Sequence, residues 1–188
     1  SSPSRIHDMA PAALDARIRA VERTASFQLT QEQRDAVRSL LARPVAVLQG
    51  GAGVGKTAVT TVLAGVWEAL GGNCVLTALS GKAALQLSRG ASAPGRPRIA
   101  FTAARLLSLL KKREEAAAAG DVFPADMPKI SSDTLLVVDE ASMMDTPTLR
   151  DLVEKLVPGS HLLCVGDHGQ LPSVGIGRVF HDLVADAR

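Results

Sequence analysis

The sequence of 188 residues is long enough for one domain with a substantial core and too short for two domains of ordinary size. Hydrophobic residues make up 46% of it and charged residues 21%, a balance typical of globular proteins, and no apolar run approaches the roughly 20 residues that span a bilayer. The net charge of +2 is too small to indicate a nucleic-acid partner by itself, and aromatic residues at 3% are too few for a surface that binds single strands mainly by base stacking.

The two cysteines, Cys74 and Cys164, both lie in short apolar runs. We expect buried, reduced thiols at these positions, because a disulfide framework or a metal site would need more ligands. Residues 1–4 lack the apolar region of a secretory signal. These features together predict a cytoplasmic protein with no membrane partner.

The chain before the first predicted strand is expected to form helices. Apolar residues recur there at helical spacing in two stretches: Leu14, Ile18 and Val21, then Val37, Leu40 and Leu41. We assign residues 1–28 to a short N-terminal helical segment and residues 29–188 to a single α/β lobe.

Four apolar runs then predict strands, at residues 45–48, 74–76, 135–138 and 162–165. Polar residues do not alternate with apolar ones in these runs, as expected for strands buried on both faces. An amphipathic helix that ends at Gly71 follows the first run, and another with Thr146 as its N-cap precedes the last. Strands that alternate with helices in this way predict an α/β fold with a mostly parallel β-sheet flanked by helices.

Two segments are less regular. Residues 89–98 contain turn residues and several arginines and have no apolar face, so an exposed basic loop is predicted there. Residues 111–132 are treated as a candidate small insertion. Their portion at 114–119 favours helix, and Gly120 and the prolines that follow interrupt it.

The segment from Gly50 to Thr57, GGAGVGKT, matches the pattern G-x-x-x-x-G-K-[ST] and stands between a predicted strand and a predicted helix. Glycines let backbone N–H groups wrap round a phosphate, and the positive end of the helix dipole adds to the attraction. Lys56 is expected to neutralise the β- and γ-phosphates of ATP, and the Thr57 hydroxyl to ligate Mg²⁺. The predicted nucleotide-binding residues of this segment are Gly51, Gly53, Val54, Gly55, Lys56, Thr57 and Ala58.

A pair of acids, Asp139 and Glu140, follows the apolar run at residues 135–138. In open α/β sheets, ligands bind at the carboxyl ends of the strands. Asp139 is therefore expected to hold Mg²⁺, and Glu140 to orient or deprotonate the attacking water. A water-activating acid favours an ATP hydrolase over a small-molecule kinase, which needs none.

The sequences DEASM at residues 139–143 and GDHGQLPSVG at residues 166–175 resemble motifs of superfamily 1 DNA helicases, within the RecD-like branch of their 1B group. The resemblance extends over roughly residues 29–183 in consistent order. It implies a RecA-like P-loop NTPase fold, with this chain as a single motor lobe.

The resemblance also implies two glutamine roles. The sequence LTQEQRDA at residues 29–36 is similar to the adenine-reading motif of the family, with Gln33 as the base contact, because an amide can donate and accept at once. Gln170 would reach the γ-phosphate. The predicted catalytic residues are therefore Lys56, Asp139, Glu140 and Gln170.

Two further segments resemble the DNA contacts of the family. TALSGKAA at residues 77–84 contains Ser80 and Lys82, and TAARLL at residues 102–107 contains Thr102 and Arg105. Backbone N–H groups at a helix start and a nearby cation suit a DNA phosphate. The family usually has a histidine directly before that arginine, where this chain has alanine. A solvated helix residue is therefore an equal interpretation of Arg105.

For the full-length protein the resemblance implies translocation on single-stranded DNA in the 5′ to 3′ direction. The second RecA-like lobe would complete the ATP site with an arginine, so the present chain alone is expected to hydrolyse ATP poorly. A larger repair or recombination complex is a candidate partner. In the family, a small hairpin that separates the DNA strands lies at the position of residues 111–132. The alanine-rich sequence of these residues does not resemble a hairpin.

Two alternatives stay open. The first is the helicase half of a conjugative relaxase, which shares most of these motifs. The second is a nucleotide-gated module that binds DNA or a partner without turnover. Intact Lys56, Asp139, Glu140 and Gln170 argue against decay of the site, which weighs against the second alternative.

Overall fold

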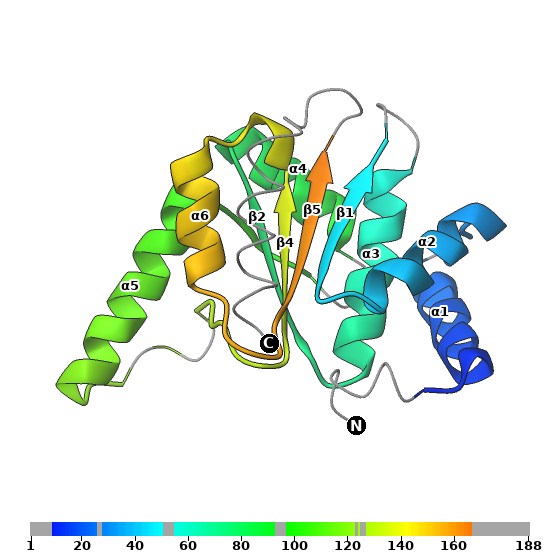
Figure 1. Ribbon diagram of the computed structural model, residues 1–188, viewed down its shortest axis with the longest axis horizontal. Helices are drawn as coiled ribbons and strands as arrows, with labels where there is room; N and C mark the ends of the chain where they lie inside the picture. Colours follow the sequence, from blue (N-terminus) through cyan, green and yellow to red (C-terminus); the bar gives the residue numbers. More distant parts are fainter. Residues whose placement is uncertain are drawn as a thin grey trace.

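The computed structural model describes residues 9–25, 28–50, 55–92, 97–122, 124 and 127–166. Within them lies one sheet of five strands in the order β1-β5-β4-β2-β3 (Figure 1). The strands are β1 (Val45–Gln49), β2 (Asn73–Ala78), β3 (Ala100–Thr102), β4 (Thr134–Asp139) and β5 (His161–Gly166). Every neighbouring pair is parallel, so the predicted α/β architecture with a mostly parallel sheet is confirmed.

The register places the carboxyl ends of all five strands at one edge of the sheet. Gln49 pairs with Gly166 across β1 and β5, and Ala78 pairs with Asp139 across β2 and β4. On the other side of β2, Ala78 also pairs with Thr102 of β3. Segments that follow different strands therefore meet at this edge, which is where open α/β sheets bind ligands.

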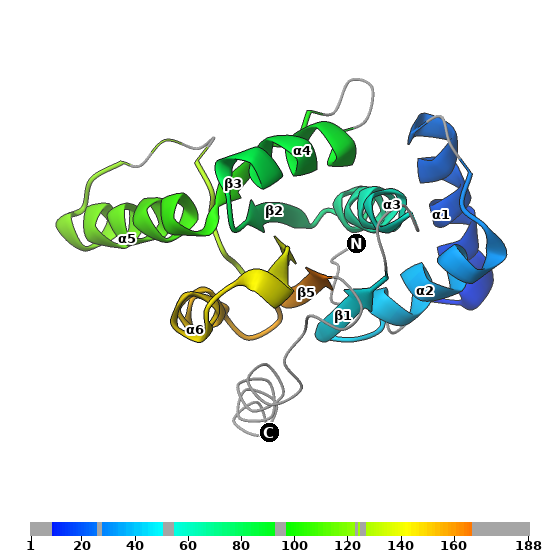
Figure 2. The ribbon, with the colours of Figure 1, turned by 90° about the horizontal axis from the view of Figure 1, so that it is seen from above.

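Helices cover both faces of the sheet (Figures 1 and 2). On one side lie α1 (Pro11–Ala25), α2 (Gln31–Leu41), α3 (Lys56–Ala69) and α4 (Gly81–Ala91), and on the other lie α5 (Ala103–Ala119) and α6 (Thr146–Glu154), with the short 3₁₀ helix η2 (Ala141–Met143) before α6. Each side buries its own apolar cluster against the strands. The helices expected before the first strand, after it and before the last strand are all present.

Helix α3 is buried almost all round, because it lies between the sheet, α1 and α4. Its largest side chain, Trp67, is fully buried and donates its indole N–H to the carbonyl oxygen of Asp133 at 2.8 Å. The Trp67 ring also packs on the ring of His161, with centroids 4.6 Å apart. The sequence predicted only one apolar face for this helix.

Two expectations for β1 and α6 were wrong. Strand β1 is at the edge of the sheet in the described residues and leaves Val47 40% exposed, so it is not buried on both faces. Helix α6 is capped by Asp145 instead of Thr146, because the Asp145 carboxylate accepts a hydrogen bond from the Thr148 N–H at 2.7 Å. The hydrogen bond to Thr148 also holds the pKa of Asp145 below its usual value.

The segment at residues 89–98 is not an exposed loop throughout. Its first residues, 89–91, belong to α4. At its far end Arg98 is only 8% exposed and forms an ion pair with Glu68 of α3, with 2.7 Å between Nη2 and Oε2. The short strand β3, which the sequence did not indicate, begins two residues later. In the sequence, a buried arginine before a short edge strand looks like part of a loop, because the acid that pairs with the arginine cannot be identified.

The region treated as an insertion begins inside a helix. Helix α5 runs to Ala119 and ends at Gly120 in the left-handed conformation, with φ of 77°, as the sequence favoured. Arg113 donates to the carbonyl oxygens of Pro124, Met127 and Pro128, each at 3.1 Å. Among the described residues between α5 and β4 there is no strand, and hence no hairpin. No helix in the described part of the chain has the length and apolar character needed to cross a membrane.

Candidate nucleotide-binding site

The chain leaves β1 and enters α3 at the sheet edge described above. Gly50 donates its N–H to the carbonyl oxygen of Gly166 at 3.3 Å, and α3 begins at Lys56. Gly55 precedes α3 with φ of 80°, a left-handed conformation that glycine adopts without steric cost. The predicted contacts Gly51, Gly53 and Val54 lie outside the described residues.

Helix α3 differs from other helices of the fold in how it begins. Its N-cap, Gly55, makes no side-chain hydrogen bond to the first turn, whereas α4, α5 and α6 begin at Ser80, Thr102 and Asp145, whose side chains do. The first N–H groups of a helix lack partners within the helix and bind anions readily. A phosphate at this position would take the place of the missing cap.

The first turn of α3 carries three of the predicted site residues. Lys56 donates from Nζ to the carbonyl oxygen of Gly50, so its ammonium group lies over the end of β1. Thr57 is exposed, and Ala58 is half-buried against the apolar cluster under α3. The position of Ala58 fits a backbone contact to a ligand better than a side-chain contact.

Gln33 lies directly against Gly55. A Cβ atom placed on Gly55 would overlap Gln33 Nε2, so glycine allows the close approach as well as the backbone conformation. Gln33 also belongs to a capping box: its Oε1 accepts from the Thr30 N–H at 2.9 Å, and Thr30 Oγ1 accepts from the Gln33 N–H at 3.2 Å. The capping box was not noticed in the sequence, although T-x-x-Q before a helix is its known signature.

The predicted acids lie at the carboxyl end of β4, where Asp139 is the last strand residue and Glu140 follows it. Only β5 lies between β4 and β1 in the sheet. Asp139 is half-buried and accepts a hydrogen bond from the Glu140 N–H at 2.9 Å. Glu140 has φ of 53° and ψ of 30°, and it is the one non-glycine residue with positive φ in the described ranges. Such backbone conformations cost roughly 1–3 kcal/mol and occur preferentially at functional sites.

The described residues contain no cluster of three or more metal-binding side chains. The donors predicted from the sequence, the Thr57 hydroxyl and the Asp139 carboxylate, are both oxygens, and Mg²⁺ is commonly held by one or two protein oxygens together with phosphates and water. Gln170, the remaining catalytic candidate, lies outside the described residues.

The predicted DNA contacts come together at the neighbouring strand ends. Ser80 caps α4 after β2 and accepts from the Ala83 N–H at 3.1 Å, and Thr102 caps α5 after β3 and accepts from the Arg105 N–H at 3.2 Å. The side chains of Lys82 and Arg105 are exposed in the first turns of these two helices. Two helix N-termini with exposed cations therefore lie side by side on the same edge as the nucleotide site.

The two cysteines are free thiols, as expected. Cys164 is buried in β5 and Cys74 is half-buried in β2. Burial raises the pKa of each thiol to about 12, so both are protonated at neutral pH. Neither contributes to the candidate site.

Comparison with known proteins supports the proposed relationship. A family model described as an AAA domain matches residues 28–188. An ATP-dependent RecD2 DNA helicase from Deinococcus radiodurans is 34% identical over 158 residues, which are 84% of this chain and 20% of that protein. The RecBCD enzyme subunit RecD from Mycobacterium tuberculosis is 37% identical over 163 residues, 81% of this chain and 28% of that protein.

A probable conjugal transfer protein TraA from Sinorhizobium fredii is also similar, with 30% identity over 155 residues, 81% of this chain and 12% of that protein. The chain thus spans less than a third of each of these relatives. A solved structure of S. cerevisiae Dbp5 bound to Nup159, Gle1, IP6 and ADP matches 96% of this chain and 51% of that chain, with a TM-score of 0.59 and 15% identity. That likeness shows a shared RecA-like fold. The chain therefore belongs to the AAA-domain family, and its predicted resemblance to RecD-like DNA helicases is confirmed.

Proposed function

We propose that the chain is the ATP-binding first motor lobe of an ATP-dependent DNA helicase. The observation that carries the proposal is the placement of the start of α3, with Lys56, and of the Asp139-Glu140 pair at one edge of an all-parallel sheet. The family membership and the similarity to RecD2 support the same conclusion.

The described residues fit this chemistry. Lys56, now on the Gly50 carbonyl, would turn to the β- and γ-phosphates, and Gln33 would read the adenine. The Thr57 hydroxyl and the Asp139 carboxylate would hold Mg²⁺, which neutralises charge on the phosphates when bound. Glu140 would accept a proton from water as the water oxygen bonds to the γ-phosphorus and the bond from that phosphorus to the ADP oxygen breaks. Gln170 would contact the γ-phosphate.

Single-stranded DNA would bind at the starts of α4 and α5. Ser80 and Thr102 place helix N-termini there, and Lys82 and Arg105 add positive charge, which suits backbone phosphates. In the full-length protein we propose 5′ to 3′ translocation with a second RecA-like lobe. A larger repair or recombination complex belongs to the same proposal, in keeping with the similarity to a RecBCD subunit.

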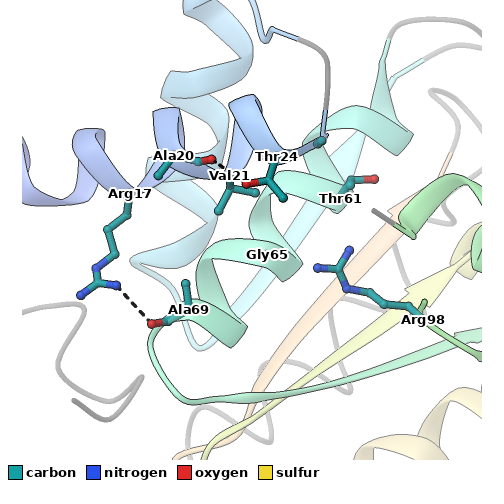
Figure 3. A pocket seen from close by; sticks show the side chains of 9 residues that line it. Arg17, Ala20, Val21, Thr24, Thr61, Gly65, Ala69 and Arg98 are labelled. Carbon is teal, nitrogen blue, oxygen red and sulfur yellow. Dashed lines mark hydrogen bonds between the residues drawn. The ribbon is translucent and has the colours of Figure 1, made fainter. Parts of the chain in front are cut away.

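The proposed domain division is residues 1–28 as an N-terminal helical segment and 29–188 as the ATPase lobe, with a small insertion at 111–132. Helix α1 contacts α3 directly, and Arg17 donates to the carbonyl oxygen of Ala69 at 3.1 Å (Figure 3). The described part of the N-terminal segment would therefore be fixed on the lobe instead of forming a separate unit.

Binding of a fluorescent ATP analogue to the 188-residue chain tests the proposal. We expect Mg²⁺-dependent binding that Lys56→Ala weakens at least about tenfold, since it removes a charge that contacts two phosphates. Lys112→Ala, on the exposed surface of α5, is the matched control and should bind like the wild type. Equal binding by the Lys56 and Lys112 variants would contradict the proposed site.

Glu140→Gln separates the motor from a nucleotide-gated binding module. In a motor, this variant should bind ATP but lose single-turnover hydrolysis of labelled ATP, because the amide cannot accept the proton. In a module without turnover, wild type and variant should behave alike. The turnover of this chain alone is expected to be slow, since an arginine from a second lobe is worth about 10³ to 10⁵ in rate.

The helicase half of a conjugative relaxase is the second candidate, and the similarity to TraA favours it. The two candidates share the ATPase chemistry and differ in the nicking activity of the longer protein. Site-specific cleavage of a supercoiled origin plasmid by the full-length protein would select the relaxase, and ATP-dependent unwinding without cleavage would select the RecD-like helicase.

A further inference from the structure

The proposed Mg²⁺ ligand Thr57 packs on the last turn of another helix. A Cβ atom placed on Gly90 of α4 would lie 2.5 Å from Thr57 Cγ2, a separation that real Cβ contacts essentially never show. The methyl group of Thr57 therefore occupies the space that any side chain at position 90 would need. Because the hydroxyl and the methyl share one Cβ, this contact sets the χ1 rotamer of Thr57 and hence the direction of its hydroxyl.

A second contact fixes the same two residues through their backbones. Thr61 Oγ1 lies 2.7 Å from the carbonyl oxygen of Thr57 and 2.9 Å from that of Gly90. Thr61 is 1% exposed, so water does not compete for its hydroxyl. Figure 3 shows Thr61 on α3, among the residues that line a pocket with α1; Gly65 and Arg98 belong to the same lining.

The last turn of α4 is also anchored through Arg98. Its guanidinium donates to the carbonyl oxygen of Ala91 and, at 2.9 and 2.7 Å, to the two carboxylate oxygens of Glu68 on α3. Thus α4 is held on α3 both through Thr61 and through Arg98.

The other end of α4 carries Ser80 and Lys82 of the proposed DNA site. Eleven helical residues extend about 16 Å, and Ala83, Ala84 and Leu87 are buried on one face, so the helix would move as a unit. Figure 2 shows α4 beside β2, reaching α3.

We propose that Gly90 is a positioning residue for Thr57, and that α4 thereby connects the DNA-facing edge to the metal ligand. The inference rests on the proposed function, in which Thr57 binds Mg²⁺. The absence of a side chain at position 90 lets the Thr57 methyl pack on α4, which points the hydroxyl toward the metal. Movement of α4 would then change the metal geometry without direct contact between DNA and nucleotide.

Gly90→Ala in the 188-residue chain tests the inference, with Gly81→Ala as the matched control. Both substitutions add one methyl to α4, and a Cβ at Gly81 meets no atom within 4 Å. The readout is the Mg²⁺ concentration that half-saturates binding of a fluorescent ATP analogue. We expect an increase of about tenfold for Gly90→Ala, the lower range for positioning residues of metal sites, and none for Gly81→Ala. In EDTA no Mg²⁺ is present for the Thr57 hydroxyl to hold. The affinity for the ATP analogue in EDTA should therefore be unchanged in both variants.

Thr61→Val and Thr61→Ser provide an independent pair in case Gly90→Ala does not fold. Valine removes the hydroxyl bridge and should raise the half-saturating Mg²⁺ concentration, whereas serine keeps the hydroxyl and should restore the wild-type value. If wild type responds to Mg²⁺ and both Gly90→Ala and Thr61→Val match it, the inference is wrong and the proposed function stands. Loss of affinity in EDTA equal to that in Mg²⁺ would overturn the positioning role, because the variant would then disturb the whole loop. If wild-type binding ignores Mg²⁺, the proposed function itself fails.

Discussion

At the scale of single residues, the backbone of Glu140 is the most informative feature. Its left-handed conformation is unfavourable for a residue with a Cβ by roughly 1–2 kcal/mol. The turn from Asp139 into η2 imposes this conformation and thereby places the carboxylate directly after the strand end. A residue chosen for stability alone at this position would be glycine, as it is at Gly120.

Glu140→Gly is therefore expected to raise the free energy of unfolding by about 0.5–1 kcal/mol. Glycine relieves the left-handed strain in the folded state. It also makes the unfolded chain more flexible, which lowers stability by roughly 0.4–1 kcal/mol, but the relief of strain is the larger of the two effects. Gly120→Ala is the converse, since φ there is 77° and nothing lies within 4 Å of the new Cβ; it should lower stability by a similar amount. Urea denaturation measures both, and a destabilised Glu140→Gly variant would show that the Glu140 side chain has a structural role.

At the scale of elements, the start of α2 combines stability with function. The capping box satisfies two backbone N–H groups, and the Gln33 amide that closes it also lies against Gly55. A change at Thr30 should therefore affect both the helix and the loop, although Thr30 itself is not a predicted nucleotide contact.

Thr30→Ala is expected to reduce the free energy of unfolding by about 1 kcal/mol, the usual cost of losing an N-cap. It should also weaken binding of the ATP analogue, because loss of the cap loosens the first turn of α2 and so displaces the Thr30 backbone N–H that orients the Gln33 amide. Thr30→Ser keeps the hydroxyl and should match wild type in both measurements. If Thr30→Ala lowers the free energy of unfolding but leaves the affinity for the ATP analogue unchanged, Gln33 is held in place by its contact with Gly55 and not by the cap.

At the scale of the whole molecule, contacts between distant segments hold the helices on the sheet. The ion pair of Arg98 and Glu68 joins the segment before β3 to α3, and the carboxylate of buried Glu22 joins α1 to α2 by accepting from the Leu29 N–H at 2.6 Å and from Arg34. Arg98 and Glu22 are polar residues that become buried only because the chain brings them to their partners, Glu68 and Arg34.

Arg98→Ala should lower the free energy of unfolding by about 3 kcal/mol, since removal of one partner leaves Glu68 and the Ala91 carbonyl without the guanidinium. Arg98→Lys should recover part of this loss, because an ammonium group keeps the charge but not the two-pronged geometry. Arg89→Ala, at an exposed position on α4, should change stability by less than about 0.5 kcal/mol. Equal effects at Arg89 and Arg98 would show that the ion pair does not stabilise the fold.

Local patterns in the sequence were sufficient for much of this structure. Four apolar runs predicted four of the strands, because buried strands lack polar residues in alternation. The segment at residues 50–57 predicted that a helix follows the first strand, as α3 does from Lys56. The Asp139-Glu140 pair was likewise readable at a strand end, whereas β3, with only three residues, was too short to show a pattern.

The order of the strands, the place of Gln33 against Gly55, the burial of Arg98 and the contact of Thr57 with Gly90 were decided only by the tertiary structure. Each depends on a partner between 22 and 33 positions away or on another strand, and no periodicity of the chain records which distant residue will be that partner. Packing chose the partners, because buried polar groups must find hydrogen bonds and close helix crossings must find small residues.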